Sequence, residues 1–174
     1  MARIIPKPLA SEEDDLVKAA GHKVKYHPRG ASAKLFAMRE DEILVAGPAG
    51  TGKSLGILHK FHLALSKYPG AKGFMARETR SSMTNSCMKT FENHVLHPID
   101  KVHLHKQDQV YRYPNGSEFA IVGLDDTEKI KSTDWDFGYI QEATETREDK
   151  WEVCTTRLRN WKMPYQQLIG DCNP

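Results

Sequence analysis

Apolar residues follow two patterns along this chain: short continuous runs, and longer stretches in which they recur at three- and four-residue steps. The run Glu42–Ala46 is bounded by Gly47-Pro48, which predicts a buried strand of a parallel sheet. Beyond the glycines that follow, the recurring residues are Leu55, Leu58, Phe61, Leu65 and Tyr68, and they stop at Pro69-Gly70. This stretch predicts an amphipathic helix with a stop signal.

A second strand and helix follow the first pair. Gly73–Ala76 predicts the strand, and apolar residues from Met83 to Val95 predict a helix that ends before Pro98. Strands that alternate with helices predict a mostly parallel sheet with crossover helices, and hence an α/β fold.

The pattern then changes to a β-hairpin inserted in the sheet. Gln109–Tyr113 and Ser117–Val122 flank Pro114-Asn115-Gly116, and Asn-Gly between alternating segments is a strong hairpin signal. Two further strands are predicted, Phe137–Gln141 and Gln167–Gly170, with a helix between them. We expect all of these strands to share one central sheet.

The helix between the last two strands has its own signals. Trp151, Cys154 and Leu158 share one face, and Thr146 with Asp149 resembles a capping box at its start.

Upstream of the first strand, Ser11-Glu-Glu-Asp predicts the start of a short helix that ends near Gly21. His22–Gly30 mixes cations with Tyr26 and Pro28 and predicts extended chain, and residues 32–38 predict a helical turn or two. We therefore divide the chain into an N-terminal arm, 1–21, and one core, 22–174.

Composition narrows the class of protein. A chain of 174 residues with 39% apolar and 28% charged residues is typical of a single globular domain. No apolar run approaches the roughly 18 residues of a membrane-spanning helix, and the N-terminus has no secretory signal pattern, so we expect a cytoplasmic protein. A net charge of +2 decides nothing about a nucleic-acid partner.

Neither the cysteines nor the histidines indicate a metal site. Cys87, Cys154 and Cys172 are widely spaced and predict reduced, structural thiols. The eight histidines include no zinc-binding pair, and we expect His103 and His105 to face outward from a strand.

The strongest chemical signal is the loop between the first strand and the first helix, which matches the pattern G-x-x-x-x-G-K-[ST] of a phosphate-binding P-loop. Its residues are Gly47, Pro48, Ala49, Gly50, Thr51, Gly52, Lys53 and Ser54. Glycines let backbone N–H groups point at phosphates, at the positive end of the following helix. We expect Lys53 to contact the β- and γ-phosphates and the Ser54 hydroxyl to coordinate Mg²⁺.

A P-loop enzyme also needs a carboxylate at the end of a neighbouring strand, and Glu142 follows the strand Phe137–Gln141. We expect Glu142 to polarise the attacking water; a solvated strand-end residue is the alternative. Gln141 stands where an acidic residue usually precedes it, so we place Gln141 beside the metal, with Ser54, the phosphates and water holding the ion. Asn173 follows the last strand and would reach the same edge, either to sense the γ-phosphate or simply to end the strand.

Several cations near these strand ends have no single interpretation. Arg77 and Arg80 follow the second strand and could contact nucleotide, DNA or a carboxylate. Arg157 and Arg159 close the helix after Glu142, where cations also favour the helix dipole. Lys129 and Lys131 fit a solvated surface equally well.

Taken in order, these motifs resemble the ATPase region of the large terminase subunit of tailed phages. The resemblance covers residues 22–174. It rests on the P-loop, on Arg77-Glu-Thr-Arg80-Ser-Ser-Met-Thr84, on Tyr113-Pro-Asn-Gly-Ser117 with Val122-Gly-Leu-Asp-Asp126, on Trp135 through Glu145, on Arg157-Leu-Arg159 and on Gly170-Asp-Cys-Asn-Pro174. It implies a P-loop NTPase of the RecA/ASCE type.

The resemblance implies a motor that hydrolyses ATP with Mg²⁺ to move double-stranded DNA into a procapsid in the host cytoplasm. Lys53, Glu142 and Asn173 would be catalytic, with Asn173 coupling hydrolysis to movement, and Tyr26 and Arg29 would lie beside the adenine. The expected partners are DNA, the portal protein, the small terminase subunit and further copies in a ring. Lys131 and Arg157 are candidates for the arginine-finger role.

The family continues into a lid and a nuclease domain, so we expect this chain to be a fragment that ends before them. Two alternatives stay open at this point. One is a helicase-type or PhoH-like P-loop ATPase, which would not need the hairpin before Glu142. The other is a nucleotide-binding fragment with little hydrolysis.

Overall fold

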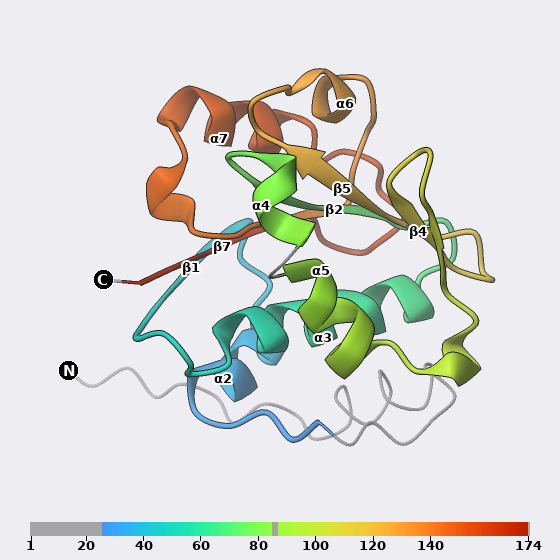
Figure 1. The fold of residues 1–174 in the computed structure, drawn as a ribbon, viewed down its shortest axis with the longest axis horizontal. Helices are drawn as coiled ribbons and strands as arrows, with labels where there is room; N and C mark the ends of the chain where they lie inside the picture. Colours follow the sequence, from blue (N-terminus) through green and yellow to red (C-terminus); the bar gives the residue numbers. More distant parts are fainter. Residues whose placement is uncertain (1–25, 85–86, 174) are drawn as a thin grey trace.

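The arrangement of the predicted strands is visible in a computed structural model that describes residues 26–84 and 87–173. The predicted arm, 1–21, lies outside these residues. One sheet runs through the centre, with helices α2, α3 and α5 on one side of it and α6 and α7 on the other (Figure 1). This is the α/β architecture that the alternation of strands and helices predicted.

The sheet has seven strands in the order β1-β7-β6-β2-β5-β4-β3 within the described ranges. Their bounds are β1 Glu42–Ala46, β2 Lys72–Arg77, β3 His103–His105, β4 Val110–Arg112, β5 Glu118–Gly123, β6 Phe137–Ile140 and β7 Gln167–Cys172. In this spatial order, the neighbouring strands from β1 through β7, β6 and β2 to β5 pair in parallel. Strand β4 pairs antiparallel with both β5 and β3. The mostly parallel sheet with an added hairpin is therefore confirmed.

The helices also follow the apolar pattern in most places. Their bounds are α2 Ala31–Ala37, α3 Lys53–Lys67, α4 Arg80–Thr84, α5 Cys87–Thr90, α6 Glu128–Lys131 and α7 Glu148–Thr156, with the π-helix η1 Phe91–Val95 and the 3₁₀ turns η2 Pro98–Asp100 and η3 Ala143–Glu145. The single helix predicted from Met83 to Val95 is instead made of α4, α5 and η1, and residues 85–86 lie outside the described ranges.

The capping box predicted at Thr146 and Asp149 is wrong. Helix α7 has Arg147 as its N-cap residue, without a side-chain cap. The Arg147 guanidinium holds both Asp149 oxygens at 2.9 Å, so this carboxylate is already engaged. The Thr146 hydroxyl is buried without a hydrogen-bond partner.

Alternation along the strands gives each face of the sheet its own apolar core. Ile57, Phe61, Phe91, Tyr139 and Ile169 belong to the core on the side of α3. The core on the side of α7 contains Phe74, Trp135, Ile140, Cys154 and Leu168. Consecutive residues of β6 and of β7 therefore point to opposite faces, as strand geometry requires.

Glycines allow large rings to cross between β2 and β6. The register pairs Gly73 with Phe137 and Phe74 with Gly138. A Cβ atom at Gly73 would lie 2.1 Å from the Phe137 ring, and one at Gly138 would lie 2.2 Å from the Phe74 ring. Each ring thus occupies the space above a glycine of the neighbouring strand.

A buried carboxylate, Asp136, links several segments at the amino edge of the sheet through hydrogen bonds. Asp136 is fully buried, and each of its oxygens accepts two hydrogen bonds. Oδ1 accepts from the backbone N–H groups of Lys162 (2.8 Å) and Met163 (3.2 Å). Oδ2 accepts from the N–H of Lys72 (2.9 Å) and from Asn160 Nδ2 (2.6 Å). Asp136 thereby ties β2 and β6 to the loop that leads into β7.

A buried lysine joins α3 to the segment that precedes β1. Lys60 is 3% exposed, and its Nζ donates to the carbonyls of Leu35 (2.9 Å) and Met38 (2.8 Å) and to the side chain of Gln167. The two carbonyls belong to the last turn and C-cap of α2, where a cation is favourable. The pKa of Lys60 is lowered to about 7, mostly by burial; the charge of the neighbouring Arg39 contributes to this shift and that of Glu40 opposes it.

Candidate functional site

The P-loop spans the gap between the end of β1 and the start of α3, at the carboxyl edge of the sheet. Gly50 and Gly52 adopt left-handed backbone angles, with φ of 75° and 79°. Such angles are accessible to glycine at little cost, and they turn successive N–H groups toward one concave side. Gly47 N–H donates to the Cys172 carbonyl at 3.3 Å, so the loop is fixed beside the end of β7.

Lys53 is held by acceptors that surround the loop. Its ammonium donates to the carbonyls of Gly47 (2.6 Å) and Pro48 (2.8 Å) and to Asn173 Oδ1 (3.0 Å). Asn173 lies just beyond β7, so this contact joins the first strand–helix unit to the end of the chain. Phosphate oxygens are acceptors of the same kind and could replace these carbonyls around the ammonium.

The same asparagine contacts the predicted catalytic carboxylate. Asn173 Nδ2 lies 3.2 Å and 3.3 Å from the two oxygens of Glu142. Glu142 follows β6 and adopts a left-handed backbone conformation, with φ of 53° and ψ of 56°. The structure therefore brings Lys53, Asn173 and Glu142 together, and their catalytic roles stay predictions.

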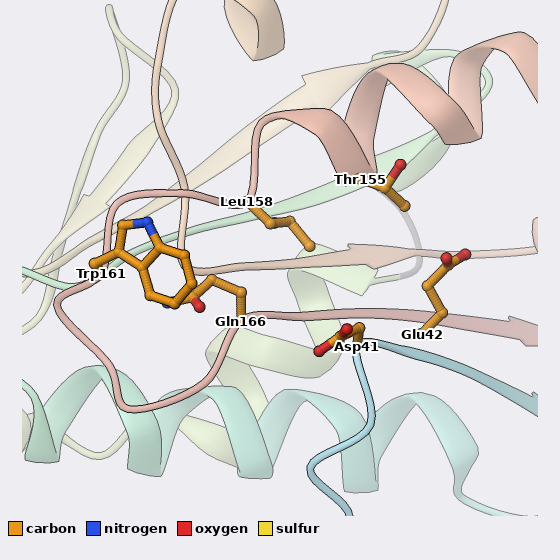
Figure 2. A pocket seen from close by; sticks show the side chains of 6 residues that line it. All are labelled: Asp41, Glu42, Thr155, Leu158, Trp161 and Gln166. Atoms are coloured by element: carbon orange, nitrogen blue, oxygen red, sulfur yellow. The ribbon is translucent and has the colours of Figure 1, made fainter.

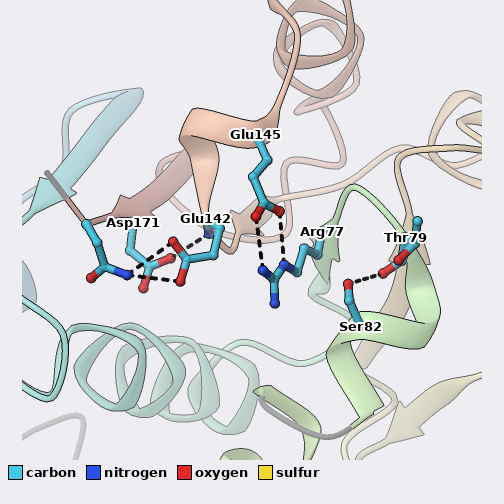
Figure 3. A network of polar contacts seen from close by, with 7 residues as sticks. Arg77, Thr79, Ser82, Glu142, Glu145 and Asp171 are labelled. Atoms are coloured by element: carbon cyan, nitrogen blue, oxygen red, sulfur yellow. Dashed lines mark hydrogen bonds and ion pairs between the residues drawn. The ribbon is translucent and has the colours of Figure 1, made fainter.

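A further carboxylate completes the group, and sequence reasoning did not single it out. Asp171 is 4% exposed, and its Oδ2 accepts from the Ser54 hydroxyl at 2.7 Å. Its Oδ1 accepts from the backbone N–H of Glu142 at 3.0 Å, and Figure 3 shows the two acids side by side. We call Lys53, Ser54, Glu142, Asp171 and Asn173 the polar ring, because their contacts form a closed circuit through the P-loop.

The remaining predicted metal residue, Gln141, is buried at the end of β6, where its N–H donates to the Ala76 carbonyl at 2.8 Å. The Tyr139 hydroxyl is buried near Ser54 and Asp171, and it has no hydrogen-bond partner among the described residues. Burial raises the pKa of Tyr139 well above its ordinary value. The phenol is therefore neutral.

Arg77 forms an ion pair at the rim of the polar ring. Its guanidinium binds Glu145 at 3.1 Å and 3.2 Å, on the same side as Glu142 (Figure 3). This hydrogen bond raises the pKa of Arg77, and the charges of Glu142 and Asp171 act in the same direction. Arg77 is thus the cation of the second strand that faces the acidic side of the site.

The other predicted cations lie elsewhere. Arg80 and Lys129 line a hollow at the ends of β2 and β5, together with Asp125 and Asp126. Lys131 pairs with Glu128 at 3.2 Å, and Arg159 pairs with Asp134 at 2.8 Å. Arg157 caps the end of α7.

The upstream residues proposed for the adenine differ in their surroundings. The Tyr26 ring stacks on His59 of α3, with 4.2 Å between centroids and 7° between planes. Gly56 permits this approach, since a Cβ atom there would lie 2.9 Å from the Ser32 hydroxyl and 3.2 Å from the Tyr26 hydroxyl. Arg29 is exposed.

A second hollow lies at the opposite, amino edge of the sheet. Figure 2 shows Asp41 and Glu42 at the start of β1 on one side of this hollow, and the exposed Trp161 at its other end, next to Gln166. Because the P-loop is at the carboxyl edge, this hollow is separate from the polar ring.

Residues 26–84 and 87–173 contain no group of three or more His, Cys, Asp or Glu placed to hold a metal ion. Over the same part of the chain, no helix has the length and apolar character needed to cross a bilayer.

In comparison with protein families, the family described as phage terminase large subunit matches residues 39–174, which is most of the chain. Comparison with curated proteins gives no match.

Solved structures of phage terminases share the fold. The large terminase of a thermophilic bacteriophage superposes with a TM-score of 0.64 at 16% identity, over 91% of this chain and 38% of that one. The ATPase domain of the Thermus phage P74-26 large terminase gives 0.64 at 16% identity, over 90% and 68%. The HK97 bacteriophage large terminase gives 0.58 at 16% identity, over 96% and 33%. This chain thus spans about a third of the thermophilic-phage and HK97 large terminases.

Proposed function

This chain belongs to the phage terminase large-subunit family, and we propose that it is the ATP-hydrolysing part of a motor that packages double-stranded DNA. The observation that carries the proposal is the polar ring. In it, the P-loop lysine and serine are linked to a strand-end glutamate through Asp171, the second-last residue of the adjacent strand β7, and Asn173, just beyond it. The thermophilic phage terminase that shares this fold has been solved with ADP and with ATP-γ-S, which supports a nucleotide at the same loop.

In this proposal residues 47–54 bind the triphosphate. The left-handed glycines and the first turn of α3 present N–H groups to the phosphate oxygens. Lys53 already lies among acceptors, so phosphates would replace loop carbonyls around an ammonium that is in place. Tyr26 would flank the base from its position on His59, and Arg29 would approach it from the surface.

Glu142 is the proposed base that orients the attacking water. Asn173 donates to both of its oxygens while it accepts from Lys53. The amide therefore contacts the phosphate-binding cation and the base at once. A change in what Lys53 binds would alter this contact, which is the physical basis on which Asn173 would couple hydrolysis to movement.

The oxygen donors of Ser54, Glu142 and Asp171 fit Mg²⁺, which prefers hard oxygen ligands and keeps waters when phosphates supply part of its shell. When bound, Mg²⁺ would neutralise charge on the β- and γ-phosphates. Ser54 would be its protein ligand, with Gln141 near the surrounding waters.

The test of the enzyme proposal is a pair of measurements on three chains. Glu142→Gln should bind ATP as tightly as the unaltered chain and lose turnover by roughly a hundredfold or more, because it keeps the shape and loses the base. Glu148→Gln, a nearby exposed carboxylate at the start of α7, is the matched control and should keep its turnover. Equal, near-zero rates in all three chains with intact binding would instead identify a nucleotide-binding fragment.

The partners are also proposed from the family. We propose that the chain tracks double-stranded DNA, works in the host cytoplasm, and assembles as a ring with the portal protein and the small terminase subunit. DNA affinity that falls steeply with salt would support phosphate tracking, and affinity without salt dependence would contradict it. Sedimentation with and without ATP and portal protein tests the ring.

A further inference from the structure

The nucleotide site has an unusual distribution of negative charge. A P-loop NTPase holds Mg²⁺ with the P-loop hydroxyl and an acidic residue on a neighbouring strand. Here the residue before Glu142 is Gln141, which is neutral. The carboxylate that contacts the P-loop hydroxyl is Asp171, on the strand between β1 and β6.

We propose that Asp171 supplies the metal-facing negative charge of this site in place of Gln141, as a positioning residue that orients Ser54 and the water shell of Mg²⁺. This inference rests on the proposed function, because it concerns the metal that accompanies the nucleotide.

The register of the sheet explains how Asp171 can take the role expected at position 141. Strands β6 and β7 are parallel, and their last printed pair is Ile140 with Gly170. Continuing that register makes Asp171 the neighbour of Gln141. Gln141 lies two positions after Tyr139, and Asp171 lies two positions after Ile169. Tyr139 and Ile169 both belong to the core on the side of α3. Strand alternation therefore places Gln141 and Asp171 on the same face, about 4.8 Å apart across the ladder.

A carboxylate at position 171, and not at position 141, places the negative charge closer to the P-loop. Strand β7 lies between β6 and β1, so its end is one strand closer to the loop that follows β1. The 2.7 Å bond to Asp171 Oδ2 orients the Ser54 hydroxyl so that its proton points at Asp171. The lone pairs of the Ser54 oxygen are then available to a cation.

Asp171 has acceptor capacity left for metal-bound water. An ionised carboxylate has about four lone-pair sites. One oxygen of Asp171 accepts from Ser54 and the other from the Glu142 N–H, with the Tyr139 hydroxyl as a further neighbour. A purely structural carboxylate in this fold looks different, since Asp136 has two donors on each oxygen.

The test compares nucleotide affinity with and without the metal. ADP is titrated into each chain by calorimetry, once with Mg²⁺ and once with EDTA, and the ratio of the two affinities is the Mg²⁺ enhancement. Asp171→Asn should reduce this enhancement by about tenfold or more, the usual effect of losing an outer-shell partner, and should not weaken the affinity in EDTA, because it removes a negative charge beside the phosphates. Adding Gln141→Glu to Asp171→Asn should restore most of the enhancement, because the charge returns to the same face one strand away.

Three outcomes would overturn the inference. An unchanged enhancement in Asp171→Asn would show that the carboxylate does not act on the metal. An equal loss of affinity in Mg²⁺ and in EDTA would show that Asp171 only shapes the loop. A chain without any Mg²⁺-dependent nucleotide binding would overturn the proposed function together with this inference, whereas the first two outcomes leave the proposed function standing.

Folding of the variants does not limit the experiment. If Asp171→Asn alone fails to fold, the double variant is compared with Gln141→Glu, which keeps both charges. The enhancement should then be similar in these two chains, and a tenfold lower value in the double variant would contradict the exchange of roles.

Discussion

Two aspartates are buried in this sheet, one at each edge, and their surroundings differ. Asp136 is 0% exposed and Asp171 is 4% exposed. Asp136 precedes β6 at the amino edge, where three backbone N–H groups and the Asn160 amide supply four hydrogen bonds. Asp171 is the second-last residue of β7, at the carboxyl edge, and accepts from one hydroxyl and one N–H.

The difference separates a structural charge from a functional one. A buried carboxylate needs hydrogen bonds to offset the loss of water, and Asp136 obtains them from groups that stay in place whether or not a ligand binds. Asp171 is bonded to Ser54, a residue that a phosphate-bound metal would engage. The two aspartates are buried to a similar degree, so burial alone does not distinguish their roles. The groups that donate hydrogen bonds to each carboxylate do distinguish them.

Replacing each of these aspartates with asparagine should reveal the largest difference between them, in the free energy of unfolding. Asp136→Asn places an NH₂ group against two donors whichever way the amide turns, so we expect the free energy of unfolding to fall by about 2–4 kcal/mol. Chemical denaturation measures this, and nucleotide affinity per folded molecule should be unchanged. A cost below about 1 kcal/mol would mean that the four-donor shell does not matter to stability.

A buried cation extends the comparison and predicts a pH dependence. The pKa of Lys60 is lowered from 10.5 to about 7, so between these values the unfolded chain binds more protons than the folded chain. Stability should therefore rise with pH, by roughly 1 to 2 kcal/mol from pH 7.0 to 8.5. Groups that face Lys60 include Arg39, which favours this direction, and Glu40, which opposes it.

The measurement is the difference in unfolding free energy between the unaltered chain and Lys60→Met at each pH. Taking the difference removes the opposite contribution of Cys87 and Cys154, whose raised thiol pKa values lower stability in alkali. A difference that stays flat from pH 7.0 to 8.5 would mean that Lys60 remains charged among its three acceptors.

The smallest expected effect is that of Asp171→Asn on stability. An asparagine oxygen can still accept from the Glu142 N–H, and its NH₂ group can donate to the Ser54 oxygen, so we expect a change below about 1 kcal/mol. Thermal unfolding without nucleotide tests this. A loss as large as that of Asp136→Asn would remove the distinction between the two residues.

Much of this fold could be predicted because continuous apolar runs and loop signals are local. The runs at 42–46 and 73–76 became β1 and β2, and Asn115-Gly116 marked the hairpin. The outward-facing histidines of β3 were also predicted, and both are exposed. The P-loop could be located because its glycines, lysine and serine stand in a fixed spacing.

The buried polar residues could not be predicted, because their burial depends on which strands are neighbours. Asp171 reaches Ser54 because β7, the last strand in the chain, lies beside the first. Asp136 reads as an ordinary charged residue between two aromatic ones. In the sequence Lys60 lies on the polar face of a predicted helix. It is buried because α2 and β7, which are distant in the sequence, pack against it.

The left-handed backbone of Glu142 has a consequence for how this protein could change over time. A residue other than glycine in that conformation costs on the order of 1 kcal/mol, so a glycine at 142 would relieve strain and favour the folded state. The same exchange would remove the proposed base. If Glu142 has that role, selection for heat resistance alone would push position 142 toward an inactive chain, and a glutamate retained there would be a sign of selection for turnover.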